Sequence, residues 1–247
     1  MQYIDIHAHD GAFENRDLSK YDHLGETMVE FNRDLTADNV SHCFISSVHA
    51  LLKDLIEGNE VTFTDAETDP RLFAYVYYHP LRVEESISEI EKYKSHKKFI
   101  GFKSRPVIHQ TEFDSDAYRP LVEAAAVIGM PILLHTWPIN DAHAVAKMAK
   151  ESKAKIIMVH ACNDKYAEAM NIVKRYDNVF VEPVTSAVYP GKIREIINIV
   201  GYERLIFGSD YGLFSRSRIL KTYEEANLSS VEEEAVYRNN AIRVFGL

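Results

Sequence analysis

The stretch PILLHTWPINDAHAVAKMAKESKAKIIMVH, residues 131–160, decides the fold. Its two ends, 131–135 and 155–160, are short apolar runs with the length of a buried strand. The segment at 140–153 between them has the apolar spacing of an amphipathic helix. Because such a helix carries the chain back along a sheet, the stretch predicts two parallel strands joined by a crossover helix.

The same alternation of apolar runs and helical segments repeats along the chain. The predicted strands are residues 3–6, 42–48, 72–78, 99–102, 131–135, 155–160, 178–182 and 204–210. The predicted helices are residues 27–35, 83–96, 116–130, 140–153, 165–177 and 191–201. Eight repeats in 247 residues favour one domain, residues 1–247, folded as a closed α/β barrel of the (β/α)8 TIM type. A doubly wound sheet is the alternative, but no G-x-G-x-x-G follows the first strand.

Composition and charge exclude several classes of function. The formal net charge of −9 does not supply the basic surface that nucleic-acid binding requires. No apolar run is long enough to span a membrane, and the N-terminus lacks the pattern of a secretory signal. Cys43 and Cys162 lie far apart inside apolar runs, which favours reduced core residues over a disulfide. We expect a cytoplasmic protein with a small-molecule substrate. The sequence leaves open whether the protein forms a homo-oligomer.

Every predicted strand ends at ionisable side chains. These are His7, His9, His49, His79, Lys103, His135, His160, Glu182 and Asp210. In a (β/α)8 barrel the carboxyl ends of the strands share one rim, where active sites are built. The sequence therefore predicts a single active site that gathers these groups.

The dyad His7-Ala8-His9 predicts half of a metal site. Side chains alternate along a strand, so both imidazoles should share one face with Asp5, while Ile4 and Ile6 face the surrounding helices. A chain with 11 histidines contains about half an H-x-H motif by chance, so the dyad alone is a weak signal.

Two further strand-end residues complete a set of metal ligands. His135 and Asp210 add a third imidazole and a carboxylate, which together suit one Zn²⁺, with Mn²⁺ or another transition metal as alternatives. Each histidine taken singly is more simply a hydrogen-bonded core residue. The convergence of four donors on one rim favours the metal.

The motifs that carry these residues resemble those of a known family. IDIHAH at 4–9, LLHT at 133–136, MVHA at 158–161 and FGSDYG at 207–212 are similar to the motifs of the amidohydrolase superfamily. The resemblance is to its amidohydrolase-related branch, which includes aminocarboxymuconate-semialdehyde decarboxylase and related lactonases and hydratases. It implies that His7, His9, His135 and Asp210 bind the metal. It also implies that His160 stands beside the metal as acid/base or substrate-polarising group, and in binuclear relatives as a ligand to a second ion.

The resemblance leaves the role of strand 4 open and is imperfect at two positions. Lys103 lies where binuclear members carry a carboxylated lysine between two metals, so a second ion would follow if Lys103 were modified. Unmodified, it could bind an anionic substrate group or form a salt bridge. Gly212 replaces the family's usual proline, and VEPVTS in strand 7 leaves the substrate role of Glu182 uncertain.

The donor set favours hydrolysis of an amide, lactone or other ester through a metal-activated water. In this reading Asp210 is the general base and His160 the acid/base or oxyanion stabiliser. The alternative is a decarboxylase or hydratase of an unsaturated carboxylic acid. A TatD-like deoxyribonuclease is less favoured, because that family places a glutamate where Lys103 stands. A metal-binding barrel without activity is the remaining hypothesis.

Several residues beyond the metal are candidates for substrate contact. Lys103, Arg105, Arg216 and Arg218 could bring positive charge to the rim for a carboxylate. Trp137 could form an apolar wall, and His49, His79 and His109 are further candidates. The long connection at 9–26 either covers the site or is a solvated excursion.

Overall fold

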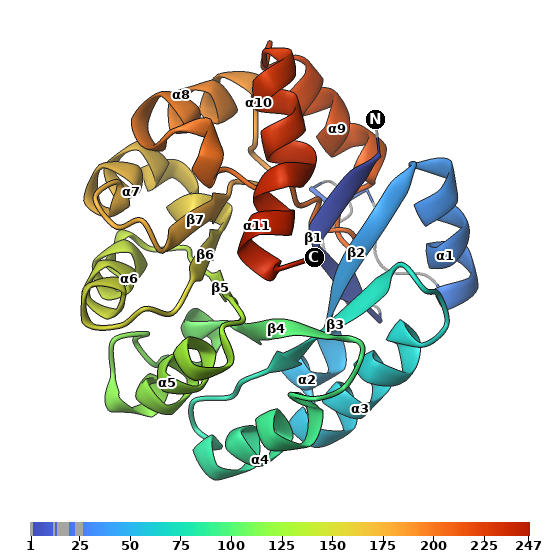
Figure 1. Ribbon diagram of the computed structural model, residues 1–247, viewed down its shortest axis with the longest axis vertical. Coiled ribbons are helices and arrows are strands. Elements are labelled where there is room, and N and C mark those ends of the chain that lie inside the picture. The colour runs from blue at the N-terminus through green and yellow to red at the C-terminus, as the bar shows by residue number, and fades with distance from the viewer. Residues whose placement is uncertain (1, 12, 14–19, 23–26) are drawn as a thin grey trace.

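The computed structural model describes residues 2–11, 13, 20–22 and 27–247 of the chain. Seven parallel strands form one sheet in the order β1 to β7, so each strand is hydrogen-bonded to its neighbours in sequence. The strands are β1 (Tyr3–Asp10), β2 (Val40–Ser47), β3 (Leu72–Tyr77), β4 (Phe99–Ser104), β5 (Ile132–His135), β6 (Ile156–Val159) and β7 (Val179–Glu182). The sheet curls, and the helices surround it (Figure 1).

Helices connect successive strands, as the alternation predicts. The connecting α-helices are α1 (Met28–Ala37), α2 (Val48–Leu52), α3 (Leu55–Ala66), α4 (Val83–Tyr93), α5 (Arg119–Ile128), α6 (Ile139–Glu151) and α7 (Tyr166–Val173). After β7 come α8 (Pro190–Val200), α9 (Arg216–Glu224), α10 (Ser230–Glu234) and α11 (Asn240–Phe245). Short helical turns are η1 (Pro106–His109), η2 (Asp116–Tyr118), η3 (His160–Lys165), η4 (Tyr202–Arg204) and the π-helical η5 (Ala235–Asn239). The helices α2, α3 and α9 to α11 are additional to the predicted ones.

Residues 204–210 were predicted as an eighth strand and are not a regular strand. They still occupy the place between β7 and β1, because Ile206 N–H donates to Val181 O (2.9 Å) and Ile6 N–H donates to Phe207 O (3.2 Å). The pairing cannot continue regularly, since Phe207 N–H donates to Val236 O in η5 and Asp210 has a left-handed φ of 55°. The structure thus confirms a parallel sheet of seven strands and not the eighth. The segment at 204–210 joins the two edge strands of this sheet, β7 and β1.

The inner face of the sheet is apolar at the amino ends of the strands. Its buried cluster is Ile4, Ile6, Phe44, Tyr75, Ile100, Leu133, Ile157, Val159, Phe180 and Ile206 with Ala241, Val244 and Phe245 of α11. The Phe44 and Phe245 rings lie 4.7 Å apart, and Lys155 Nζ, just before β6, donates to Val244 O (2.6 Å). The helix α11 therefore closes this end of the sheet, in front of the strands in Figure 1.

The predicted orientation of β1 is wrong in two respects. Ile4 and Ile6 face this inner cluster and not the surrounding helices, and Asp5 does not share the face of His7, because it turns outward to Arg216. The register between β1 and β2 shifts between Asp5 and Ala8, which breaks the simple alternation of side chains. This shift lets His7 follow Ile6 toward the centre.

No helix in the described ranges combines the length and the apolarity that crossing a bilayer requires. Of the predicted connection at 9–26, residues 12, 14–19 and 23–26 lie outside the described residues. Of its described residues, His9, Phe13 and Tyr21 line the cavity at the carboxyl ends of the strands.

Candidate metal centre and active site

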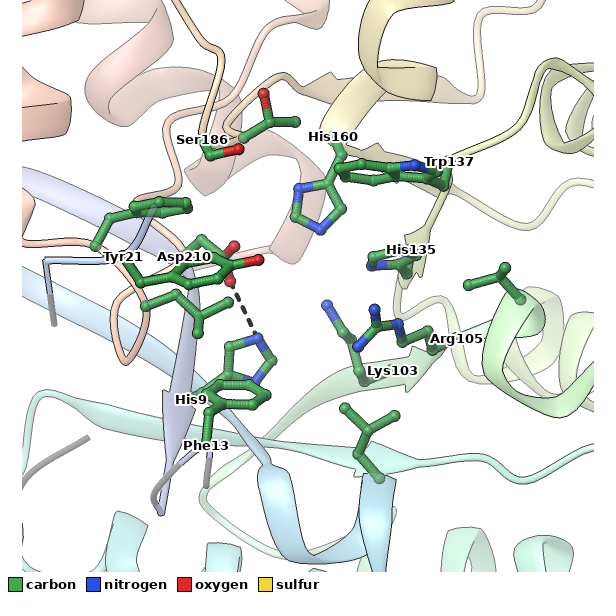
Figure 2. Close-up of a pocket in the computed structure, with 15 residues that line it drawn as sticks. His9, Phe13, Tyr21, Lys103, Arg105, His135, Trp137, His160, Ser186 and Asp210 are labelled. Carbon is green, nitrogen blue, oxygen red and sulfur yellow. Dashed lines mark ion pairs between the residues drawn. The ribbon is translucent and has the colours of Figure 1, made fainter. Parts of the chain in front are cut away.

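The carboxyl ends of the strands surround one cavity of about 240 Å³ (Figure 2). Its lining residues are His9, Phe13, Tyr21, Leu51, Lys103, Arg105, Val107, His135, Trp137, His160, Thr185, Ser186, Asp210, Leu213 and Phe214. They come from the carboxyl ends of β1, β4 and β5, from α2 and η1, and from the segments that follow β1, β6, β7 and η4. This is the rim that the sequence predicts.

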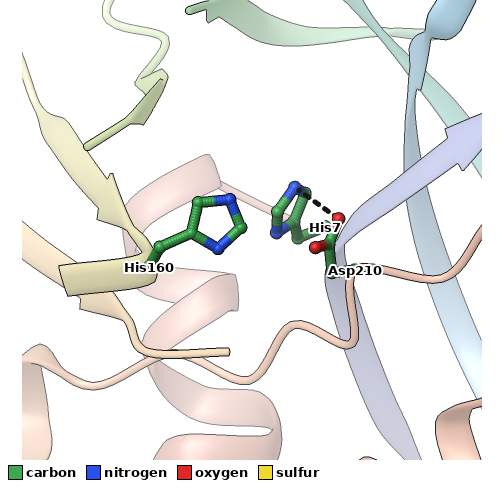
Figure 3. A group of neighbouring side chains, drawn as sticks. All are labelled: His7, His160 and Asp210. Atoms are coloured by element: carbon green, nitrogen blue, oxygen red, sulfur yellow. Dashed lines mark ion pairs between the residues drawn. The ribbon is translucent and has the colours of Figure 1, made fainter. Parts of the chain in front are cut away.

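At the floor of the cavity lies a buried group of metal-binding side chains. His7, His160 and Asp210 each offer a ligand atom, and these atoms lie within 4.8 Å of one another (Figure 3). His9 joins them, because its Nε2 lies 3.2 Å from Asp210 Oδ1, while His7 Nε2 lies 3.3 Å from the same oxygen. Residues separated by about 200 positions in sequence therefore meet at one carboxylate oxygen.

Each of these histidines is held through its Nδ1. His7 Nδ1 lies 3.0 Å from Glu182 Oε2, and His9 Nδ1 lies 3.2 Å from Ser46 O. His160 Nδ1 contacts the carbonyl oxygen of Val184. A carbonyl can only accept, so these Nδ1 atoms carry the protons and the Nε2 lone pairs of His9 and His160 remain for a ligand bond.

The residues present fit a divalent cation. Asp210 Oδ1 is buried and has no hydrogen-bond partner among the described residues. The Nε2 lone pairs of His9 and His160 thus face this oxygen without a donor between them, whereas Lys103 Nζ lies 3.1 Å from His7 Nε2. Buried polar atoms rarely stay unpaired. A cation at this point would satisfy all of them, and second partners on the Nδ1 atoms are typical of metal-binding histidines.

The electrostatics keep the group in its metal-binding protonation state. Burial lowers the pKa of His160 to about 4, against the opposing charge of Asp210. Burial lowers the pKa of His7 well below its usual value, and Lys103 adds to this. For Asp210 burial acts to raise the pKa, but the contact with His9 and the charges of His160 and Lys103 outweigh it, so its pKa is lowered. Near neutral pH the imidazoles are neutral and Asp210 is ionised.

His135, a predicted ligand, is placed beside this group and not within it. It is buried, its ring stacks on Trp137 (5.9 Å between centroids), and it meets His160 edge-on at 4.5 Å. His160, predicted as acid/base or substrate-polarising group and in binuclear relatives as a ligand to a second ion, belongs to the trio of closest ligand atoms. The ligand role of His135 stays a prediction.

The cavity also holds two of the predicted cationic residues. Lys103 Nζ lies 3.1 Å from His7 Nε2, and burial lowers the pKa of Lys103 to about 8. Arg105 lines the same wall (Figure 2). Arg218 lies near the cavity, where its Nη2 donates to Ser186 O (3.4 Å). Arg216 was predicted for the rim and is instead fully buried, with Nε donating to Asp5 Oδ2 (2.9 Å). It cannot meet a substrate.

The three other histidines predicted to contact a substrate, His49, His79 and His109, do not line the cavity. His49 lies on α2, and its Nε2 is 3.2 Å from Glu57 Oε2. His79 and His109 stack on each other at 3.9 Å, and His109 Nε2 pairs with the Tyr77 hydroxyl at 2.8 Å. The geometry of this cavity gives no support for their predicted substrate contacts.

Sequence reasoning missed the aromatic walls from loops and the partners of the histidines. Phe13, Tyr21 and Phe214 lie in connections whose course no periodicity specifies. Glu182 was recognised as a strand-end group, but its position behind His7 depends on which strands meet. The sequence signal for this contact is the ionisable residue Glu182 at the end of β7.

The sequence profile of the amidohydrolases matches residues 4–247, and none of the curated protein sequences matches. Similar solved structures include 2,6-dihydroxybenzoate decarboxylase from Rhizobium, at 13% identity over 100% of this chain and 99% of that chain, with a TM-score of 0.78. A dihydroxybenzoic acid decarboxylase from Polaromonas, with bound manganese and 2-nitroresorcinol, has 14% identity over 100% and 97% and a TM-score of 0.79.

A candidate 2-pyrone-4,6-dicarboxylic acid hydrolase from Pseudomonas putida is also similar, at 17% identity over 99% of this chain and 97% of that chain, with a TM-score of 0.72. At these identities the likeness establishes a shared fold.

Proposed function

The chain belongs to the amidohydrolase family, as its motifs predicted, and from this premise we propose that it is a metal-dependent decarboxylase of a small aromatic carboxylic acid. One observation carries the proposal. The candidate metal group forms the floor of a cavity that has two cations on one wall, Lys103 and Arg105, and aromatic side chains on the others.

The walls suit a planar acid. Trp137 and Phe214 supply flat apolar surface, and Tyr21 packs on Phe214 with ring centroids 5.6 Å apart. A carboxylate would be bound by Arg105 and Lys103, since charge-assisted hydrogen bonds are strong in a site that excludes water. Several similar structures are decarboxylases of hydroxylated benzoic acids, which supports the same substrate class.

We propose that His7, His9, His135 and Asp210 hold one divalent ion in a (β/α)8 barrel whose eighth position is the segment after β7. Zn²⁺ and Mn²⁺ both suit imidazole and carboxylate donors, and a Polaromonas relative was solved with manganese. His160 could replace His135 as the fourth ligand, because its ligand atom lies closer to those of His7 and Asp210. When bound, the ion supplies Lewis acidity toward the substrate oxygens.

The residues of this chain then have defined tasks. Arg105 and Lys103 orient the carboxylate, and the aromatic walls exclude water. The bond between the ring carbon and the carboxylate breaks, its electron pair stays on the ring carbon, and carbon dioxide leaves. The ring carbon takes up one proton. Asp210 is ionised near neutral pH and faces the cavity from its floor (Figure 2). It would accept this proton from a solvent water, whose hydroxide leaves to solvent, and pass it to the ring carbon.

Hydrolysis of a lactone, which the motifs alone favoured, is the second candidate. The pyrone dicarboxylic acid hydrolase has the same fold, and a dicarboxylate could use Arg218 near Ser186 for its second carboxylate. In that reaction the product keeps every carbon of the substrate.

The experiment offers 2,6-dihydroxybenzoate and 2-pyrone-4,6-dicarboxylate separately to protein loaded with Mn²⁺ or Zn²⁺. We expect carbon dioxide release from the first acid, and a decrease of about 10²- to 10⁴-fold in kcat for Asp210→Asn. The exposed Asp116→Asn variant is the control. Ring opening of the pyrone without carbon dioxide would favour the hydrolase, and no turnover of any aromatic acid would reject the decarboxylase.

A further inference from the structure

Behind the candidate metal centre lies a fully buried ion pair that no step of the proposed reaction uses. Asp5 on β1 and Arg216 on α9 are both completely buried, and Arg216 Nε donates to Asp5 Oδ2 over 2.9 Å. A buried ion pair contributes little net stability, because the cost of removing both charges from water offsets their attraction. Its presence here calls for an explanation other than stability.

Asp5 accepts four hydrogen bonds that join the two chain segments carrying metal-binding residues. Its Oδ1 accepts from the backbone N–H of His7 (3.2 Å) and of Ser209 (3.0 Å). Its Oδ2 accepts from the Ser209 hydroxyl (2.6 Å) and from Arg216. One carboxylate therefore ties the backbone of His7 to the residue that precedes Asp210.

The same network holds the residue that follows Asp210. Tyr211 N–H donates to the Ser209 hydroxyl oxygen (3.2 Å), and the Arg216 guanidinium lies 3.6 Å above the Tyr211 ring. Both neighbours of Asp210 are thus fixed from outside the sheet. Asp210 itself has a φ of 55°, a left-handed conformation that is strained for a residue other than glycine and persists only where its surroundings impose it.

We propose that Asp5, Ser209 and Arg216 are positioning residues that hold Asp210 in this left-handed conformation, so that its Oδ1 stays opposite the Nε2 atoms of His7 and His9. None of the three touches the cavity, and they act through the backbone of Asp210. This inference rests on the proposed metal centre. It predicts that metal affinity depends on a network that neither binds the metal nor meets the substrate.

The test compares two buried serines of the same kind. Ser209→Ala removes the hydroxyl that links Asp5 to Tyr211. Ser86→Ala is the matched control, because the Ser86 hydroxyl is also buried, donates to His79 O and accepts from His79 N–H, away from the centre. For each variant Mn²⁺ affinity is measured by competition with a chelating indicator, and thermal unfolding is measured on the metal-free protein. The visible spectrum of bound Co²⁺ reports the coordination.

We expect Ser209→Ala to weaken the Kd for Mn²⁺ by about 10- to 100-fold and to change the Co²⁺ bands, as replacements behind metal ligands typically do. Ser86→Ala should keep the parent's Kd and bands at a similar loss of stability. If Ser209→Ala does not fold, the same measurements are made on the double variant Asp5→Asn with Arg216→Met. This double variant leaves no unpaired buried charge. Its control is Asp69→Asn with Arg71→Met, an ion pair of 2.7 Å elsewhere.

A Ser209→Ala or paired variant that folds and keeps the parent's Kd and Co²⁺ spectrum would overturn the positioning role while leaving the metal centre intact. Equal losses of affinity in Ser209→Ala and Ser86→Ala would also overturn it, because the effect would then be general destabilisation. A parent protein that binds no divalent metal would overturn the proposed centre together with this inference.

Discussion

Glu182 determines which nitrogen of His7 can bind a cation. Its Oε1 accepts from Val184 N–H (2.7 Å), so its Oε2 is left for His7 Nδ1. Burial raises the pKa of Glu182, and the charge of Lys103 opposes this. A cation beside His7 Nε2 favours the arrangement in which Nδ1 keeps the proton and Glu182 is ionised.

Glu182→Gln should reverse this arrangement. The amide oxygen would keep the bond to Val184 N–H, and the amide NH₂ would donate to His7 Nδ1, which moves the ring proton to Nε2. We expect the Kd for Mn²⁺ to weaken by about 10- to 100-fold, measured by chelator competition. Glu195→Gln is the control, because the Glu195 carboxylate accepts from the Tyr166 hydroxyl (2.6 Å), away from the centre. An unchanged Kd would show that Glu182 does not set the tautomer.

Asp10 makes the stability of the protein depend on pH. Its Oδ2 accepts from the Thr62 hydroxyl (2.6 Å), its Oδ1 has no partner among the described side chains and backbone groups, and burial raises its pKa to about 7. The folded state therefore binds this proton more tightly than the unfolded state. The contribution of Asp10 to the free energy of unfolding is largest at pH 4 and is lost as the pH rises toward 7.

Asp10→Asn should remove that dependence. Between pH 5 and pH 8 the parent's free energy of unfolding should fall relative to that of the variant by roughly 2–3 kcal/mol, because one pKa unit corresponds to about 1.4 kcal/mol. Urea unfolding at both pH values measures the difference. Parallel pH profiles for parent and variant would contradict the assignment.

At the scale of elements, the corner between α2 and α3 requires a glycine. A Cβ on Gly58 would lie 2.1 Å from Ala50 N and 2.4 Å from Ala50 Cα, which are backbone atoms of α2. The two helices can approach this closely only without a side chain at position 58. Since Leu51 of α2 lines the cavity, this approach also shapes the site.

Gly58→Ala should separate α2 from α3 and lower the free energy of unfolding by about 3 kcal/mol, the upper end of the usual overpacking cost. Gly129→Ala is the comparison, because Gly129 ends α5 with a φ of 79° and has open space around it. There only the left-handed backbone is penalised, by about 1–2 kcal/mol. Urea unfolding measures the free energy of unfolding of both variants. A smaller loss for Gly58→Ala than for Gly129→Ala would contradict the crowding between position 58 and Ala50.

Across the whole molecule, the candidate metal centre joins the first strand to the segment that lies between β7 and β1. His7 and His9 come from the first strand, and Asp210 comes from the segment that fills the gap between β7 and β1. A cation bound there would connect the edges of the seven-stranded sheet where regular strand pairing is absent.

Metal binding should therefore stabilise the fold. At a free Mn²⁺ concentration 100 times the Kd, the gain is about 2.7 kcal/mol, which corresponds to an increase in Tm of roughly 5–10 °C for a chain of this size. Calorimetry with and without Mn²⁺, and after chelation, measures the shift. Asp210→Asn should lose most of it, and a parent Tm insensitive to both metal and chelator would contradict the centre.

Local sequence patterns predict the repeating strand–helix order, the rim at the strand ends and the presence of His7, His9, His160 and Asp210 there. These follow from local periodicity, because apolar spacing reports how each segment is buried and parallel strands must end on the same side. The ligand role of His135 remains to be tested.

Three features depend on contacts between distant segments. These are the orientation of the side chains of β1, the irregular course of residues 204–210 and the burial of Arg216. The register shift between Asp5 and Ala8 depends on pairing with β2, and the course of the last segment depends on Val236 in η5. Arg216 is buried because Asp5, 211 positions earlier, offers it a carboxylate. Such partners are distant in sequence, so no local pattern of apolar and polar residues records them.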